Sequence, residues 1–87
     1  MEYYKILWKK SAVKELKNID KHIIPKIIST VESLSKNPFP LGVKKPSGAE
    51  FNYRIRVGDY RIIYSFYKKE LTIEIIRVGH RRDVYKK

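Results

Sequence analysis

The sequence predicts a small α+β domain in which a strand and a helix hairpin precede a group of further strands. Alternating apolar and polar residues near the N-terminus predict the first strand. Apolar residues at helical spacing between residues 12 and 34 predict two helices, and strand-like alternation resumes on both sides of Gly58. With 87 residues the chain is expected to form one domain, 1–87. A domain of this size buries roughly 60–65% of its unfolded surface, so one modest core without a large enclosed active site is expected.

Two segments flank the predicted helices. Residues 2–10, EYYKILWKK, predict a strand, one face of which carries Tyr4, Ile6 and Trp8. Residues 35–50 contain three prolines and two glycines and predict a long surface loop. Lys44 and Lys45 in this loop could contact phosphate groups, but solvated surface charge is the interpretation we favour for them.

The helical region predicts a hairpin of two helices. Ser11 is the predicted N-cap of the first helix, and Asp20 is that of the second. The second helix has a wide apolar stripe, made by Ile23, Ile24, Ile27, Ile28, Val31 and Leu34. Pro25 lies near the start of this stripe and removes one backbone hydrogen bond, so we expect a kink or a loosened first turn there.

The charge balance indicates a polyanionic partner. Twenty Lys and Arg residues against nine Asp and Glu give a net charge of +11, which suits binding to nucleic acid or to an acidic protein. Residues 1–50 contain ten lysines and no arginine, whereas all six arginines lie in residues 54–82. Because a guanidinium can hold a phosphate through two hydrogen bonds, the second half is predicted to carry the function.

Composition also limits the compartment and the chemistry. The chain has no cysteine, so neither a disulfide framework nor a thiolate metal site is available. No apolar run approaches the ~20 residues that a membrane span needs, and the N-terminus lacks the pattern of a secretory signal. A cytoplasmic protein without membrane association is therefore expected.

Residues 53–64, YRIRVGDYRIIY, predict a β-hairpin with Gly58 at the first central position of a type II′ turn. This turn puts Arg56 opposite Arg61. Strand side chains alternate between the two faces of a sheet. One face then carries Phe51, Tyr53, Ile55, Val57, Tyr60, Ile62, Tyr64 and Phe66, and the other carries Asn52, Arg54, Arg56, Arg61, Ile63 and Ser65.

The arginine-bearing face is expected to stay open while the apolar face takes the helices. Like charges directly opposite one another destabilise a sheet, so the pair of Arg56 and Arg61 indicates that an anion normally binds there. Glu74 on the next strand is the nearby acid that could neutralise them, depending on the register of the turn in residues 67–71. Arginines that only keep the sheet soluble are the alternative interpretation.

Residues 71–87, LTIEIIRVGHRRDVYKK, predict a last strand through about Val78, a break at Gly79 and a short basic tail. The tail brings together three kinds of functional side chain, in His80, Arg81, Arg82 and Tyr85. Guanidiniums stabilise negative charge, an imidazole carries protons and a phenol ring stacks on a base, as phosphodiester chemistry requires. No His, Asp and Glu cluster has the spacing of metal ligands, and no nucleophilic triad or phosphate-binding glycine loop occurs.

Two segments together resemble the RelE/ParE superfamily of toxins from type II toxin–antitoxin systems, and specifically its RelE branch. They are YRIRVGDYR, residues 53–61, and VGHRRDVY, residues 78–85, and the similarity covers nearly the whole chain. The resemblance implies a compact antiparallel sheet of about four strands with the N-terminal helix hairpin on one face. It also implies an endoribonuclease, or mRNA interferase, that cuts messenger RNA in the ribosomal A site. In such toxins the 2′-hydroxyl of the RNA attacks the adjacent phosphate, and no metal or cofactor is needed.

The resemblance assigns roles to individual residues by position. Arg54 and Arg56 stand where RelE-type toxins have basic strand residues, often lysine, that engage the 2′-hydroxyl and the scissile phosphate. Arg61 matches the arginine that stabilises the phosphorane charge. Arg81 matches the arginine near the leaving 5′-oxygen, and Tyr85 matches the tyrosine that stacks on or orients the substrate.

The identity of the general base is left open by the sequence. Arginine keeps its proton far above neutral pH, so the two strand arginines are poor bases where a lysine could serve. His80 or Tyr85 could take that role. Otherwise the enzyme depends on electrostatics and on the geometry that the ribosome imposes.

Two other functions stay open at this point. ParE-like toxins share the fold, lack the catalytic set and bind DNA gyrase, and a generic RNA- or DNA-binding module would also be basic. For a toxin, the expected partners are messenger RNA, the ribosome and a cognate acidic antitoxin, whose disordered amphipathic segment folds over the helices and the sheet. Operator DNA is expected to be contacted only through the antitoxin complex.

Overall fold

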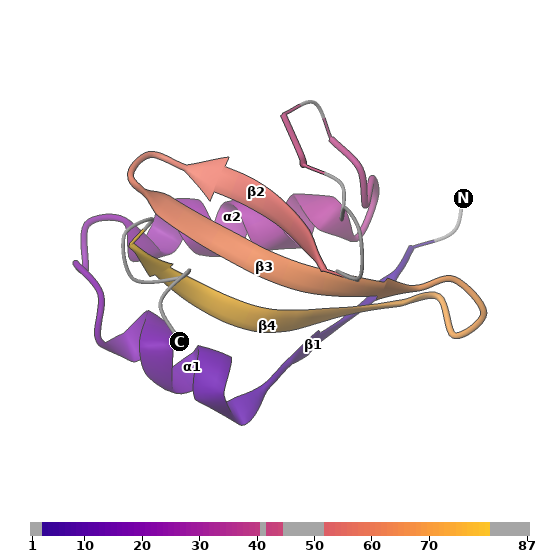
Figure 1. Ribbon diagram of the computed structural model, residues 1–87, viewed down its shortest axis with the longest axis horizontal. Coiled ribbons are helices and arrows are strands. Elements are labelled where there is room, and N and C mark those ends of the chain that lie inside the picture. Colours follow the sequence, from indigo (N-terminus) through magenta and orange to yellow (C-terminus); the bar gives the residue numbers. More distant parts are fainter. Residues whose placement is uncertain (1–2, 41, 45–51, 81–87) are drawn as a thin grey trace.

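The computed structural model describes residues 3–40, 42–44 and 52–80, and its elements follow the predicted order. Two helices and four strands form an α+β domain, which confirms the predicted fold class (Figure 1). The elements are β1 (Lys5–Trp8), α1 (Lys10–Lys17), α2 (Ile24–Leu34), β2 (Tyr53–Val57), β3 (Tyr60–Tyr67) and β4 (Thr72–His80).

The four strands form one mixed sheet in the order β1-β4-β3-β2. β2 with β3, and β3 with β4, pair antiparallel as expected, but β1 pairs parallel to β4, with Lys5 opposite Thr72 and Trp8 opposite Ile75. The expectation of a purely antiparallel sheet is thus corrected at this edge. Parallel neighbours need a long crossover, and the chain between β1 and β4 supplies one through both helices and the β2–β3 hairpin.

Pairing of β1 with β4 also fixes where α1 begins. The N-cap is Lys9, not the predicted Ser11, and no side chain caps this end. The Lys9 N–H donates to the Ile75 carbonyl (3.0 Å), while the Lys9 carbonyl accepts the first helical hydrogen bond from Val13 (3.0 Å). The end of the strand therefore leads directly into the helix, and this overrides the preference of serine for a cap.

The start of α2 differs from the prediction in a similar way. The Asp20 carboxylate accepts the His22 N–H (2.9 Å) and forms a turn before the helix instead of capping it. The N-cap is Ile23, and Pro25 falls in the first turn, where its missing N–H is not needed for a helical hydrogen bond. The helix thus begins late enough to accept the proline without losing a helical hydrogen bond.

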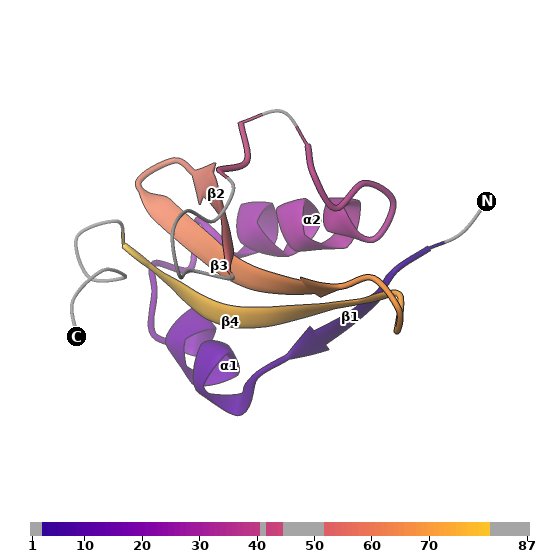
Figure 2. The same cartoon turned by 45° about the vertical axis from the view of Figure 1, so that its right-hand side comes forward.

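Both helices contribute to one core. α2 lies across one face of the sheet, and α1 lies beside β4, past the end of β1 (Figures 1 and 2). The buried side chains come from both helices and from β2, β3 and β4; they include Ala12, Ile27, Val31, Leu34, Ile55, Val57, Ile62, Tyr64, Ile73, Ile75 and Val78. Within the described ranges, neither helix is long and apolar enough to cross a membrane.

Tyr64 is the largest side chain of this core, and its polar end is satisfied. The ring is fully buried, and the hydroxyl donates a hydrogen bond to the Pro38 carbonyl in the segment after α2. Burial, together with the nearby Tyr53, raises the pKa of the Tyr64 phenol. The neutral phenol thus links the loop after α2 to the centre of the sheet.

The β2–β3 hairpin has the predicted register and turn. Val57 lies opposite Tyr60 and Arg56 lies opposite Arg61. Gly58 has a φ of 60°, whereas Leu71 is the non-glycine residue with a positive φ among the described residues. Only the first central position of the turn therefore has a positive φ, which defines a type II′ turn.

β4 carries an irregularity that reverses its alternation. Arg77 pairs with Ile63 and Ile75 pairs with Tyr64, so Ile76 is an extra residue, a β-bulge. As a result Val78 joins the core although Arg77 precedes it on the other face. The strand continues through Gly79, which pairs with Arg61, so the predicted break at Gly79 is wrong: pairing with β3 holds this segment extended.

Candidate nucleic-acid interface

The sheet face opposite α2 carries two rows of basic residues that run across the strands. Partner residues in a sheet project to the same face. The turn row, next to the β2–β3 turn, consists of Arg56, Arg61 and Gly79, and the middle row consists of Lys44, Arg54, Ile63 and Arg77. We call the five cations of these rows the basic face: Lys44, Arg54, Arg56, Arg61 and Arg77.

The turn row brings two of the predicted site residues together. Arg56 lies opposite Arg61 as predicted; Arg56 is exposed and Arg61 is half-buried. The Arg56 Nε donates to the Gly58 carbonyl (2.8 Å), which holds this guanidinium beside the turn. Two guanidiniums thus stand in adjacent strands at one end of the hairpin, an arrangement in which like charges oppose folding.

The middle row contains a cation whose place the sequence did not reveal. Lys44 pairs with Arg54 across the outer edge of β2: its N–H donates to the Arg54 carbonyl (2.8 Å), and the Arg54 N–H donates to the Lys44 carbonyl (3.1 Å). The exposed Lys44 side chain therefore shares the face of Arg54. Lys44 is part of the basic face, whereas Lys45 lies outside the described residues.

Arg77 closes the middle row on the other side and is fixed by α1. Its Nε and Nη2 contact the Glu15 Oε2 at 3.3 and 3.1 Å. The second carboxylate oxygen of Glu15 accepts the Val78 N–H (3.0 Å), at the edge of β4 that β1 does not reach. Between the arginines of this row, Ile63 is 9% exposed, as expected where long guanidinium stems cover an apolar side chain.

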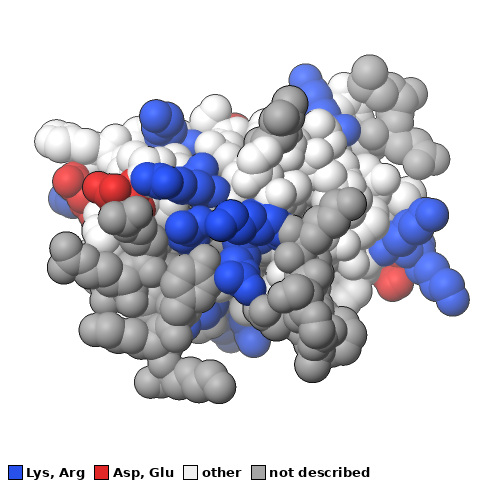
Figure 3. Space-filling view, turned by 45° about the horizontal axis from the view of Figure 1, so that its top comes forward, with Lys and Arg blue, Asp and Glu red and all other residues white. Residues whose placement is uncertain are grey.

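Of two described acids near the sheet, Glu15 contacts Arg77 of the middle row, whereas Glu74 lies away from both rows. Glu74 is opposite Ser65, and it accepts a hydrogen bond from the Tyr67 hydroxyl (3.3 Å). The register thus places Glu74 beyond the middle row, on the side away from the turn. Figure 3 shows Lys and Arg side chains gathered near the middle of the surface in view and acidic ones toward its margins.

His80 does not share the basic face. It pairs with Tyr60, whose side chain belongs to the helix side, and the two rings meet edge to face with centroids 5.6 Å apart. Both rings line a pocket of about 360 Å³ between the end of α1 and the end of β4, which also includes Asp20. The predicted site residues Arg81 and Tyr85 lie outside the described residues.

Metal binding finds no support in the described part of the chain. Residues 3–40, 42–44 and 52–80 contain no group of three His, Asp or Glu side chains that could hold an ion. The basic face carries guanidinium and ammonium groups, which bind and stabilise phosphate oxygens.

The fold and the basic face define a small cationic α+β domain, and comparison with known proteins identifies its family. Residues 6–85 match the family model described as the ParE toxin of the type II toxin–antitoxin system parDE. The chain is 40% identical over 85 residues to toxin RelE3 of Methanocaldococcus jannaschii, covering 93% of this chain and 94% of the relative. It therefore belongs to the RelE/ParE superfamily of type II toxin–antitoxin toxins.

Solved structures agree with this assignment. The archaeal RelE–RelB complex from Pyrococcus horikoshii superposes with a TM-score of 0.80 at 30% identity, covering 93% of this chain and 98% of that one. The isolated Escherichia coli RelE toxin superposes with a TM-score of 0.77 at 21% identity, covering 94% and 90%. The second likeness concerns the fold alone.

Proposed function

We propose that the chain is a ribosome-dependent endoribonuclease that cuts messenger RNA in the ribosomal A site. The observation that carries this proposal is the pair of Arg56 and Arg61 in the turn row, flanked by the middle row of cations. A sheet face built this way binds a chain of phosphates, and relatives named RelE share most of the length of the chain.

The proposed reaction is attack of the 2′-hydroxyl on the adjacent phosphorus. The 2′-oxygen forms the new P–O bond and loses its proton, and the bond to the 5′-oxygen breaks and that oxygen gains a proton. The products are a cyclic phosphate and a 5′-hydroxyl. Arg54, Arg56 and Arg61 would stabilise the extra negative charge on the phosphorane, a kind of contact typically worth about 2–4 kcal/mol in other enzymes.

Proton transfer has less support than charge stabilisation. The side chain of His80 lies on the helix side of the sheet, away from the turn row, which speaks against His80 as the base. Arginine is not a base at neutral pH. We therefore propose that the described residues act mainly by electrostatics, and that Arg81 and Tyr85 contribute the leaving-group and substrate contacts implied by their motif.

A ParE-like toxin that binds DNA gyrase is the second candidate, and the family model favours it by its description. The two candidates differ in what happens to RNA. After brief induction, mapping the 5′ ends of cellular RNA should reveal new ends in frame within translated messages, with untranslated RNA spared. Growth arrest without new ends, and with inhibited gyrase supercoiling, would assign the chain to the second function.

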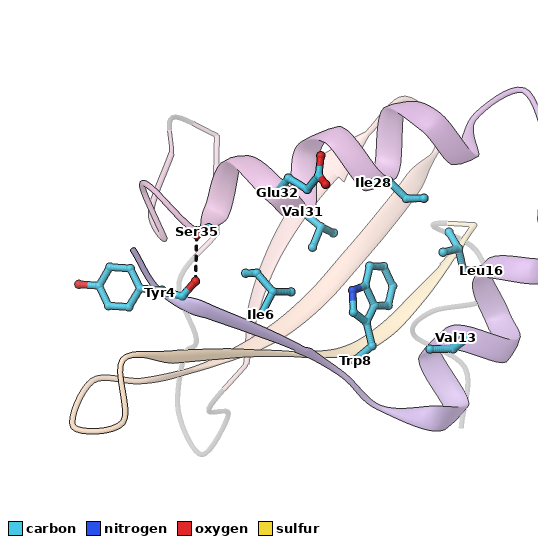
Figure 4. A pocket seen from close by; sticks show the side chains of 9 residues that line it. All are labelled: Tyr4, Ile6, Trp8, Val13, Leu16, Ile28, Val31, Glu32 and Ser35. Atoms are coloured by element: carbon cyan, nitrogen blue, oxygen red, sulfur yellow. Dashed lines mark hydrogen bonds between the residues drawn. The ribbon is translucent and has the colours of Figure 1, made fainter. Parts of the chain in front are cut away.

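We further propose that a co-encoded antitoxin binds the chain, since relatives have been solved as complexes of RelE with the antitoxin RelB. An apolar groove of about 680 Å³ lies between β1, α1 and α2, and Trp8, Leu16 and Ile28 project into it (Figure 4). At one end Lys36 lies 5.9 Å from the ring centroid of Tyr3. An amphipathic antitoxin helix suits the apolar lining of the groove, provided that its acidic flank lies toward Lys36 and away from Glu32, which also lines the groove.

Charge placed in the groove should separate toxicity from neutralisation. Ile28 is 39% exposed, so Ile28→Glu should fold. We expect this variant to arrest growth like the wild type but to be rescued poorly by the antitoxin, with at least about tenfold weaker binding because a carboxylate would be buried against apolar groups. Lys26→Ala on the same helix is the matched control. Full rescue of Ile28→Glu would contradict the use of this groove.

A further inference from the structure

Gly79 is a glycine that the backbone of the strand does not require. Of the glycines that the structure describes, Gly42 and Gly58 have positive φ angles, and Gly79 is not among them. It lies inside β4 with regular partners, Arg61 opposite Gly79 and Val78 opposite Ile62. Glycine in the interior of a strand weakens the sheet, and such a glycine often marks a place where a ligand or another backbone approaches closely.

The position of Gly79 indicates what could approach. A side chain here would project from the basic face, next to Arg61 in the turn row and two positions from Arg77 in the middle row. Neighbouring side chains on one sheet face stand roughly 4.5–7 Å apart, so omitting one leaves a gap comparable in width to a phosphate group. Gly79 is partly exposed, and together with Arg77 and Glu15 it lines the pocket of about 360 Å³ at the end of β4.

Both sides of this gap carry guanidiniums whose positions are constrained. Arg61 is half-buried within the central hairpin. Arg77 is held by two contacts to Glu15, whose other oxygen is bound to the backbone of the adjacent Val78. Fixed guanidiniums bind a phosphodiester with less loss of side-chain entropy than free lysines do.

We propose that Gly79 is the floor of a phosphodiester notch, a gap on the basic face bounded by Arg61 and Arg77 into which the RNA backbone fits. The RNA identity of the ligand rests on the proposed nuclease function; the notch itself rests on the register and the charges. Gly79 is here a positioning residue that acts by being small. Any side chain with a branched Cβ would occupy the place of the phosphate.

Because β-branched residues favour strands, Gly79→Val should keep or raise stability while removing binding, an outcome that a purely structural role of the glycine would not give. Gly79→Ala provides a smaller step should the valine variant fold poorly. Ser65→Val adds the same side chain to the same face, on the far side of the middle row, and is the matched control.

Two readouts test the notch on the purified, folded chain: the urea unfolding midpoint, and binding of a fluorescein-labelled 2′-O-methyl oligoribonucleotide that cannot be cleaved. We expect Gly79→Val to weaken probe binding and cleavage of ribosome-bound messages about tenfold or more, with Gly79→Ala intermediate and Ser65→Val near wild type. An unchanged or higher unfolding midpoint for Gly79→Val should accompany the loss.

Three outcomes separate this inference from the proposed function. Normal binding and cleavage by a folded Gly79→Val would overturn the notch and leave the nuclease proposal intact. If the wild type binds the probe but cleaves no message, and Gly79→Val loses probe binding, the notch would be supported and the nuclease proposal overturned. A wild type that does not bind the probe would overturn the notch directly.

Discussion

The two faces of the central hairpin are built from alternate residues of the same strands, yet they have opposite properties. On the helix side, Ile62 and Tyr64 are completely buried, and the Tyr64 hydroxyl is hydrogen-bonded. On the other side, Arg61 faces Arg56, and Arg54 lies beside Lys44. Burial of the first face stabilises the fold, whereas the second face destabilises it by holding like charges close together.

The comparison teaches that stability and function can be changed separately in this chain. A substitution on the basic face should alter activity with little loss of stability, and a substitution on the helix side should do the reverse. Three variants break or sharpen this contrast.

Arg61→Ala should have the largest effect. We expect cleavage of translated messages to fall about 30- to 1000-fold, equivalent to ~2–4 kcal/mol of lost transition-state stabilisation, because a guanidinium of the turn row is removed. The free energy of unfolding should stay within about 0.5 kcal/mol of wild type, since relief of repulsion from Arg56 offsets the lost strand preference. Primer extension on induced cells and urea unfolding measure the two quantities.

Arg61→Lys is the matched control, because it keeps the charge but not the planar fork. It should recover only part of the activity. Undiminished growth arrest by well-expressed Arg61→Ala would remove Arg61 from the site.

Tyr64→Phe should give the converse result on the helix side. Loss of the hydrogen bond to the Pro38 carbonyl leaves a buried acceptor, so we expect the free energy of unfolding to drop by about 1–2 kcal/mol. Cleavage by the folded protein should be unchanged. Urea unfolding together with a cleavage assay well below the melting temperature checks both statements.

The Tyr64 phenol also makes the stability of the wild type depend on pH, with a defined sign, and Tyr64→Phe tests this. Burial raises the pKa of the Tyr64 phenol in the folded state, so above about pH 10 the unfolded chain releases a proton that the folded chain retains. Stability should therefore fall as pH rises above that value, and less steeply in Tyr64→Phe. Parallel pH profiles for the two proteins would contradict the assignment.

Lys44→Ala should have the smallest effect, and it tests whether the RNA-binding part of the basic face extends to Lys44. Lys44 is exposed and contributes charge at the end of the middle row, so we expect RNA binding to weaken about two- to fivefold. The slope of binding against salt concentration should decrease by about one counterion. Lys26→Ala, an exposed lysine of α2, is the control and should change neither quantity.

The hairpin and its arginine pair could be predicted from the sequence because they depend on local rules. A glycine at the first turn position fixes the type II′ turn, and alternation then assigns each residue to a face. The apolar stripe of the second helix is confirmed in part, because Ile27, Val31 and Leu34 are buried in the core whereas Ile28 is 39% exposed. Helix starts were less accurate, because backbone pairing of β1 with β4 and the turn at Asp20 outweigh local cap preferences.

The rest of the candidate site depends on contacts between residues far apart in the chain. Lys44 reaches the middle row through a single backbone bridge from a proline-rich loop, and Arg77 is positioned by a carboxylate from α1. The placement of His80 on the helix side follows from the bulge at Ile76, which has no clear sequence signature. Glu15 lies next to the apolar side of α1. An acid in such a position was the one sequence signal that could have pointed to its contact with Arg77.

The bulge at Ile76 determines which of the following side chains of β4 face the core. If Ile76 were paired regularly, without a bulge, Arg77 would turn toward the core and Val78 away from it, although no charge and no motif would have changed. Deleting Ile76 would instead keep Arg77 opposite Ile63 and Val78 in the core. Anyone grafting this strand with Ile76 onto another sheet must therefore keep the bulge if Arg77 is to stay on the basic face.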